Sequence, residues 1–299
     1  MPSRKPILLA LGDVHIRHTT PVSRAEKDWY AVMTARFQQL KAKQHELGMV
    51  PILVAGDLVD RFNLPSSVVT WALENIPRLY SCVGQHDLDN WQYESRLRGT
   101  YGALVKARIV TDLPAEQWTT IPGETPIHVW SLPWGFNSVP ETLPDGIKVA
   151  AIHRYLWSTD KNKHMGAEEN SRVTSLAGLL PMFNCLVTGD NHCQFRAGKV
   201  HNSGSLFSTT SAQIKHIPSL CVLYNDGTSE AVPFPEEKAW QDSVTEVARE
   251  TKRSGLVDEL ENLDIEGADF AHLLSVLEDK SGERTKKIVR ELRGAIFGN

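Results

Sequence analysis

Five apolar runs in the sequence each end in aspartate or histidine, and this repeated pattern constrains the fold more than any other feature. The runs are ILLALGDVH (residues 7–15), PILVAGDLVD (51–60), LYSCVGQHD (79–87), KVAAIH (148–153) and NCLVTGDNH (184–192). Each run predicts a buried β-strand that delivers polar side chains at its carboxyl end. In open α/β sheets, ligands collect beyond the carboxyl ends of the strands, so the five endings should converge on one site.

Helical patterns alternate with these strands, which predicts an α/β domain. Ser23 and Glu26 read as a capping box before a helix with an apolar stripe, which Gly48 would end. Pro65 suits the first turn of a second helix, and residues 171–182 predict a third.

Two further stretches indicate β-structure. Residues 129–135 predict a strand followed by a turn. Residues 199–235 are rich in β-forming residues, and Asn225-Asp226-Gly227 is typical of a hairpin turn. We place a domain boundary near Pro233 and Pro235, which gives a main domain over residues 1–235. Residues 236–299 are charged and predict a helical C-terminal region for partner binding or oligomerisation.

Composition narrows the class of protein. A net charge of −4 over 299 residues predicts no general attraction to nucleic acid, so polyanion binding would need a local patch or metal ions. The four cysteines form no CxxC pair and predict buried free thiols rather than a disulfide framework. No apolar stretch reaches the roughly 20 residues of a membrane span. The sequence therefore predicts an intracellular protein without membrane contact.

The polar residues at the five endings have the chemistry of a metal site. They are Asp13, His15, Asp57, Asp60, Gln85, His86, Asp87, His153, Asp190 and His192. Carboxylate, imidazole and amide oxygen ligands suit Mn²⁺, Fe²⁺ or Zn²⁺, not a thiolate zinc site. The set is too large for one ion. Two ions about 3.5–4 Å apart that share a carboxylate would use it, and such pairs catalyse displacement at phosphorus.

The order and wording of these motifs resemble the calcineurin-like metallophosphoesterase superfamily, whose pattern runs DxH, GDxxD, GNH(D/E), a lone histidine and GHxH. The resemblance covers about residues 7–210. Two longer stretches give a more specific resemblance. The stretch GDLVDRFNLPS at the second run and the stretch NSGSLF after the last run resemble SbcD-type DNA nucleases, especially those carried by bacteriophages. The implied fold is a layered β-sandwich flanked by helices, with a small helical C-terminal appendage.

The resemblance also implies a role for each motif residue. The implied ligands of the first ion are Asp13, His15, Asp57 and His192. Asp57 would bridge to a second ion, whose remaining ligands are Gln85, His153 and Asp190. His86 would protonate the leaving oxygen or steady the transition state, and Asp87 would orient His86.

Two implied ligands depart from the family pattern, and both belong to the second ion. Gln85 stands where the family has asparagine, and Asp190 stands where it usually has histidine. Glutamine adds a methylene whereas aspartate is shorter than histidine, so the ion can shift toward residue 190 and keep its ligands. The added carboxylate favours Mn²⁺, with Mg²⁺ as the alternative. A degraded second site that holds a single ion is the other interpretation.

The function that the resemblance implies is a metal-dependent DNA exonuclease or endonuclease. It would act in DNA repair, recombination or replication, in a bacterial or phage-infected cytoplasm, with an SbcC-type ATPase and as a homodimer. Two alternatives remain open. One is a phosphatase or phosphodiesterase acting on nucleotides or phosphoproteins. The other is a non-catalytic metal-binding assembly subunit, which would not need His86 and Asp87.

Overall fold

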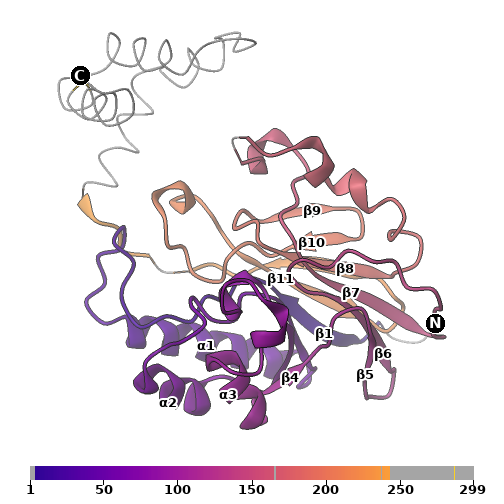
Figure 1. The fold of residues 1–299 in the computed structure, drawn as a ribbon, viewed down its shortest axis with the longest axis horizontal. Helices are drawn as coiled ribbons and strands as arrows, with labels where there is room; N and C mark the ends of the chain where they lie inside the picture. Colours follow the sequence, from indigo (N-terminus) through magenta and orange to yellow (C-terminus); the bar gives the residue numbers. More distant parts are fainter. Residues whose placement is uncertain (1–3, 165, 237, 243–285, 287–299) are drawn as a thin grey trace. The chain divides into compact units, whose positions relative to one another are not determined.

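The computed structural model describes residues 4–164, 166–236, 238–242 and 286. Within these residues the chain forms two mixed sheets of six strands, packed face to face. The first has the strand order β12-β11-β1-β2-β3-β4 and the second the order β5-β6-β7-β8-β10-β9. Three α-helices of the described part lie together beside the first sheet (Figure 1). The predicted α/β layered sandwich is therefore confirmed.

The elements have the following bounds. The first sheet contains β1 (Pro6–Leu11), β2 (Ile52–Ala55), β3 (Leu79–Cys82), β4 (Val110–Asp112), β11 (Ser219–Tyr224) and β12 (Ser229–Pro233). The second contains β5 (Trp118–Ile121), β6 (Ile127–Leu132), β7 (Ile147–His153), β8 (Cys185–Gly189), β9 (Phe195–Ala197) and β10 (Val200–Asn202). The helices are α1 (Trp29–Glu46), α2 (Ser66–Asn75) and α3 (Thr100–Lys106).

Alternation along the strands divides the core into layers, because successive side chains point to opposite faces of a sheet. On β1, Leu8 and Ala10 face the second sheet, whereas Leu9 and Leu11 pack with the cluster that includes α1. A third cluster covers the outer face of the second sheet and includes Phe183. Both faces of each sheet are thus buried, which explains why the strands read as continuous apolar runs.

The parallel strands end at a common edge. β1, β2 and β3 are parallel neighbours in the first sheet, and β7 and β8 are parallel neighbours in the second. At the end of β1, Gly12 lies against β8: a Cβ added to it would lie 3.1 Å from the Cα of Gly189. This close approach joins the strand ends of the two sheets, so all five polar endings meet.

Two helix predictions need correction. Trp29 begins α1, but Asp28 caps it by accepting a hydrogen bond from the Ala31 amide at 3.1 Å. The predicted capping box is wrong because Ser23 donates to the Thr209 carbonyl and Glu26 pairs with Arg24. The predicted helix over 171–182 is also wrong.

In that stretch the chain forms short 3₁₀ turns, Glu169–Ser171 and Val173–Leu176. Gly178 and Pro181 disfavour a longer helix. The second helix and the Asn225-Asp226-Gly227 hairpin are confirmed.

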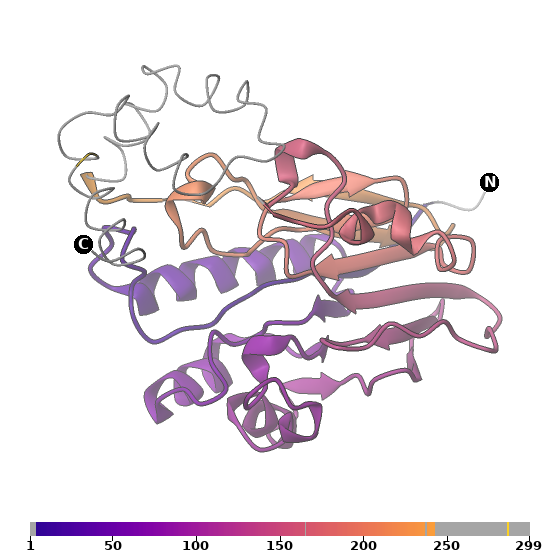
Figure 2. The same ribbon diagram turned by 45° about the horizontal axis from the view of Figure 1, so that its top comes forward.

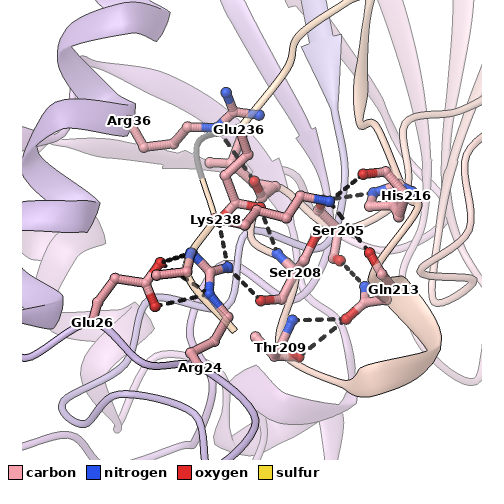
Figure 3. A network of polar contacts seen from close by, with 12 residues as sticks. Arg24, Glu26, Arg36, Ser205, Ser208, Thr209, Gln213, His216, Glu236 and Lys238 are labelled. Carbon is pink, nitrogen blue, oxygen red and sulfur yellow. Dashed lines mark hydrogen bonds and ion pairs between the residues drawn. The ribbon is translucent and has the colours of Figure 1, made fainter. Parts of the chain in front are cut away.

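A polar network joins residues 234–236 and 238–241 to α1, to the segment before it and to the loop that follows β10 (Figure 3). Figure 2 shows the chain after β10 passing beside α1. Arg24 is 1% exposed and pairs with Glu26 and with Glu236 at 2.8 Å. Arg36, on α1, donates to the carbonyls of Phe234 and Pro235 at 2.6 Å each. Lys238 donates to the carbonyls of Gln213 and His216 in the loop after β10.

The compact unit that holds both sheets includes the described residues up to 242, and the predicted domain boundary at residue 235 stays a prediction. The predicted helical region over 236–299 lies outside the described residues, apart from 236, 238–242 and 286. No helix in the described ranges combines the length and the apolar character that a bilayer-crossing segment needs.

Candidate metal centre

The predicted site residues lie together beyond the strand ends, each placed by its own strand. β1 leads to Asp13 and His15, and β2 leads to Asp57. β7 ends at His153 itself. The remaining predicted residues follow β3 (Gln85, His86 and Asp87) and β8 (Asp190 and His192). The expectation that distant motifs converge is therefore met by the fold.

Four of these residues have a left-handed backbone. The φ angle is +50° at Asp13, His15 and Asp57, and +79° at Asp190. Residues other than glycine rarely adopt this conformation, which costs of order 1–3 kcal/mol each and concentrates at functional sites. The loops hold one another in place: the Asp190 amide donates to both carboxylate oxygens of Asp13, at 2.8 and 3.0 Å.

One group of potential ligands contains Asp13, His15 and His192, each offering an atom within 4.8 Å of the others. The Nε2 atoms of His15 and His192 are 3.0 Å apart. His15 Nε2 also lies 3.7 Å from Asp57 Oδ2. These four residues are the ones expected to hold the first ion.

Asp57 lies at the centre of the arrangement. Its Oδ1 accepts a hydrogen bond from the His86 amide at 2.9 Å. Its Oδ2 lies between two imidazoles, 3.3 Å from His153 Nε2 and 3.7 Å from His15 Nε2. Asp57 belongs to two of the potential ligand groups, one with His15 and His86 and one with Asp13 and His153. This central position suits a carboxylate shared by two ions.

A second chain of contacts joins His153, Gln85 and Asp190. His153 Nδ1 donates to the Ala55 carbonyl at 2.7 Å, so its Nε2 faces the site. Gln85 Oε1 lies 2.8 Å from that Nε2, and Gln85 Nε2 donates to Asp190 Oδ1 at 2.7 Å. The two residues that depart from the family pattern are therefore in direct contact.

Burial and mutual charge shift the pKa values in the site. Burial raises the pKa of Asp13 to about 7 and lowers the pKa of His15 well below its usual value. Burial also opposes charge on His153 and Asp57, but their opposite charges outweigh it. The pKa of His153 rises to about 10 and that of Asp57 falls. Cation binding at such a site would be coupled to proton release.

The donor set fits divalent metal ions. Asp57 Oδ2 and His15 Nδ1 are buried and have no hydrogen-bond partner among the described residues. Buried polar atoms without partners are rare and costly, about 1–3 kcal/mol each. A side chain at position 84 would collide with Asp57 and His153, so glycine there keeps the space between them open. Carboxylate, imidazole and amide donors match the preferences of hard or borderline divalent ions.

His86 and Asp87 have separate partners. The ring Nδ1 of His86 donates to the Asp60 carbonyl at 2.8 Å, which leaves Nε2 free, and the side chain is exposed. The buried Asp87 carboxylate instead accepts backbone hydrogen bonds from Gly84 at 2.8 Å and Val59 at 3.0 Å. Through these bonds Asp87 positions the loops after β2 and β3, and the orientation of the His86 ring by Asp87 stays a prediction.

Sequence reasoning missed contributions made through the backbone and from the last strands. The Asp60 carbonyl that holds His86 has no signature in the sequence. Asn202 holds the loop after β8 by donating to the carbonyls of Asn191 and Cys193 at 2.6 and 2.8 Å. Ser203 Oγ accepts the Gly12 amide at 2.7 Å. In the sequence, only the NSGSLF stretch pointed to these contacts of Asn202 and Ser203.

Residues 7–192 match the family described as calcineurin-like phosphoesterase. The match covers more than half of the chain, so the chain belongs to the calcineurin-like phosphoesterase family. Membership indicates metal-dependent hydrolysis of phosphoric esters, which agrees with the clusters of potential metal ligands. No curated protein matches the chain.

The contact between Gln85 and Asp190 makes their substitutions interdependent. We expect Gln85→Asn and Asp190→His each to weaken binding of the proposed second ion by about tenfold or more. The longer side chain at position 85 compensates for the shorter one at position 190, and either substitution alone removes this compensation. The double variant should recover much of the loss, with a coupling energy of about 0.5–3 kcal/mol. Metal content after gel filtration in limiting Mn²⁺ measures this. An Asp190→Ala variant with unchanged metal content and activity would contradict a second ion at this position.

Proposed function

We propose that this phosphoesterase is a DNA nuclease of the SbcD type that uses two divalent ions, preferably Mn²⁺. The proposed first-ion ligands are Asp13, His15, Asp57 and His192. The proposed second-ion ligands are Asp57, Gln85, His153 and Asp190. When bound, two such ions polarise a phosphate ester and supply an activated water.

The protein residues supply proton transfer and positioning. With Nδ1–H committed to the Asp60 carbonyl, the free Nε2 of His86 can carry the proton for the leaving oxygen. His86 stands beside the ligand group, with its ring 4.9 Å from that of His15. The His86 amide donates a hydrogen bond to Asp57 Oδ1, so one contact joins the proposed proton donor to the proposed bridging ligand.

A groove lined in part by residues of the candidate centre supports a polymeric substrate. Its volume is about 520 Å³, and its lining includes Asp190 and His192 together with Lys161 and Lys163. Lys163 pairs with Glu169 at 3.2 Å, whereas Lys161 is exposed. A lysine in the same groove as the proposed ligands suits a phosphate that flanks the scissile bond of a nucleic acid. This groove is the observation that carries the proposal.

We also propose an SbcC-type ATPase as partner and self-association of the chain. Both rest on the GDLVDRFNLPS and NSGSLF stretches, and they assign partner binding to the predicted C-terminal region, residues 236–299. At the start of that region, Lys238, Ala239 and Gln241 form hydrogen bonds with His216, Glu26 and Arg24.

Cleavage of linear and circular DNA in Mn²⁺, beside a generic aryl phosphodiester and a phosphomonoester, tests the proposal. We expect the highest kcat/KM on DNA, loss of activity in a chelator and recovery with Mn²⁺. Cleavage of circular DNA would identify an endonuclease. Preference for the phosphomonoester would favour the phosphatase alternative, and metal binding without any hydrolysis would favour the assembly subunit.

Lys161, an exposed lysine in the lining of the groove, offers a test of the substrate class. Lys161→Ala should raise KM for DNA and reduce the slope of log K against log salt by about 0.7–0.9, the share of one phosphate contact. Hydrolysis of the aryl phosphodiester should not change. Lys106→Ala, on α3 and outside the groove lining, is the matched control. Equal effects of the two substitutions on DNA cleavage would show that the groove does not hold the strand.

A further inference from the structure

A second group of potential ligands lies between the two sheets. It consists of Cys185, Cys221 and His201, which each offer an atom within 4.8 Å of the others. All three are buried, with exposed fractions of 1%, 2% and 3%. Cys185 begins β8, whereas the candidate metal centre follows the last residue of that strand. The group shares no residue with the other described ligand clusters, and phosphoester chemistry gives it no role.

The two thiols come from opposite sheets and face each other. Cys185 lies on β8 in the second sheet and Cys221 on β11 in the first, and their Sγ atoms are 3.6 Å apart. Two sulfurs on one tetrahedral zinc ion, with Zn–S bonds of about 2.3 Å, are separated by about 3.8 Å. The observed separation is therefore close to the one that a shared ion requires.

His201 adds a third donor with an unsatisfied nitrogen. It lies on β10 and pairs in register with Val187 on β8, whose side chain faces the space between the sheets. Its Nε2 lies 3.0 Å from Ser229 Oγ. Its Nδ1 is buried and has no hydrogen-bond partner in the described part of the chain. Burial lowers the pKa of His201 to about 4, so the ring is neutral and able to ligate.

We propose that Cys185, Cys221 and His201 bind one zinc ion, which joins β8 and β10 of the second sheet to β11 of the first. Two thiols would lose their protons on binding, and the two thiolates balance the charge of Zn²⁺ in this apolar setting. An ion bound only to the folded chain would add to its stability. Three protein ligands would leave the fourth tetrahedral position to a water molecule, and the site would be separate from the phosphoesterase centre.

A disulfide is the competing use of the same pair. A disulfide would place the two sulfurs about 2.05 Å apart, whereas the Sγ atoms of Cys185 and Cys221 are separated by 3.6 Å. A disulfide would also leave His201 Nδ1 buried without a partner among the described residues, whereas a metal ion can take this atom as a third ligand. The contacts of His201 therefore favour metal binding.

Cobalt tests the site because a thiolate-to-cobalt charge-transfer band reports cysteine ligation, and the candidate phosphoesterase ligands include no thiol. The full-length chain should be produced in cobalt-supplemented medium, so that the ion can enter before the site is buried. We expect the wild-type chain to show this band. Cys185→Ser and Cys221→Ser should lose it, and His201→Phe should retain less than a tenth of the bound cobalt after dialysis.

Two other cysteines provide matched controls. Cys82→Ser removes a buried thiol whose Sγ lies 3.9 Å from the Val54 carbonyl, and Cys193→Ser removes a half-buried one. Both variants should keep the band. Zinc should raise the melting temperature of the Cys82→Ser variant by more than that of Cys185→Ser, in which only the phosphoesterase centre is left to bind the ion. Absence of the band in the wild-type chain, its loss only in Cys193→Ser, or a Cys185–Cys221 disulfide found by mass spectrometry would each overturn the proposal.

Discussion

Replacement of His86 by alanine should lower kcat by about 10²- to 10⁴-fold while the protein keeps its metal ions. The reason lies in the contacts of the ring. Nδ1 is occupied by the Asp60 carbonyl, and the exposed Nε2 is free to protonate a leaving oxygen. Loss of the ring removes the proposed proton donor, but the backbone amide of residue 86 still donates to Asp57. Turnover of DNA and metal content should be measured on the same preparations.

The control and the contrary outcome distinguish a proton donor from a ligand. His128→Ala alters a histidine whose Nδ1 contacts Thr120 Oγ1 on the neighbouring strand, far along the sequence from the motifs, and should leave turnover unchanged. His86 also belongs to a potential ligand group with His15 and Asp57. If His86→Ala folds normally but loses a metal ion, His86 is a ligand and its proposed role must be abandoned. A substrate with a better leaving group should partly rescue the variant only if His86 is the acid.

The strands and the composition of the candidate site were predictable because both depend on local pattern. A buried strand such as β2 reads as an apolar run, and Asp57 follows it directly. Parallel neighbours bring such endings to one edge, so convergence follows from topology. The same local logic failed for residues 171–182, where the apolar pattern suits either a helix or compact turns. It also failed for the capping box, because the buried Arg24 takes Glu26 as its partner.

Long-range geometry could not be predicted from single residues. The left-handed backbone at Asp13, His15 and Asp57 depends on loops from different strands that bind one another. The hydrogen bond from Gln85 to Asp190 joins residues that are 105 positions apart. The pair could be suspected only because both residues depart from a family pattern. Cys185 and Cys221 meet for the same reason, since opposing sheets bring together residues that no motif connects.

Replacement of Arg24 by methionine should lower the free energy of unfolding by about 3–5 kcal/mol. Arg24 is fully buried and forms an ion pair with Glu236 (Figure 3). The side chain of Glu236 is only 3% exposed. Methionine fills a similar volume but leaves the Glu236 charge buried without its partner. The Ser208 carbonyl also loses a hydrogen bond of 2.7 Å. Chemical denaturation followed by circular dichroism measures the loss.

Arg4→Met is the matched control, because Arg4 and its partner Glu230 lie 3.7 Å apart with side chains 44% and 40% exposed. An exposed pair of this kind contributes less than about 1 kcal/mol. Adding Glu236→Gln to Arg24→Met should recover part of the stability, since it removes the charge that was left unpaired. If Arg24→Met costs no more stability than Arg4→Met, the network does not hold residues 234–236 and 238–241 in place. A cost that Glu236→Gln relieves would identify Arg24 as the residue that holds this segment against the loop beside the groove.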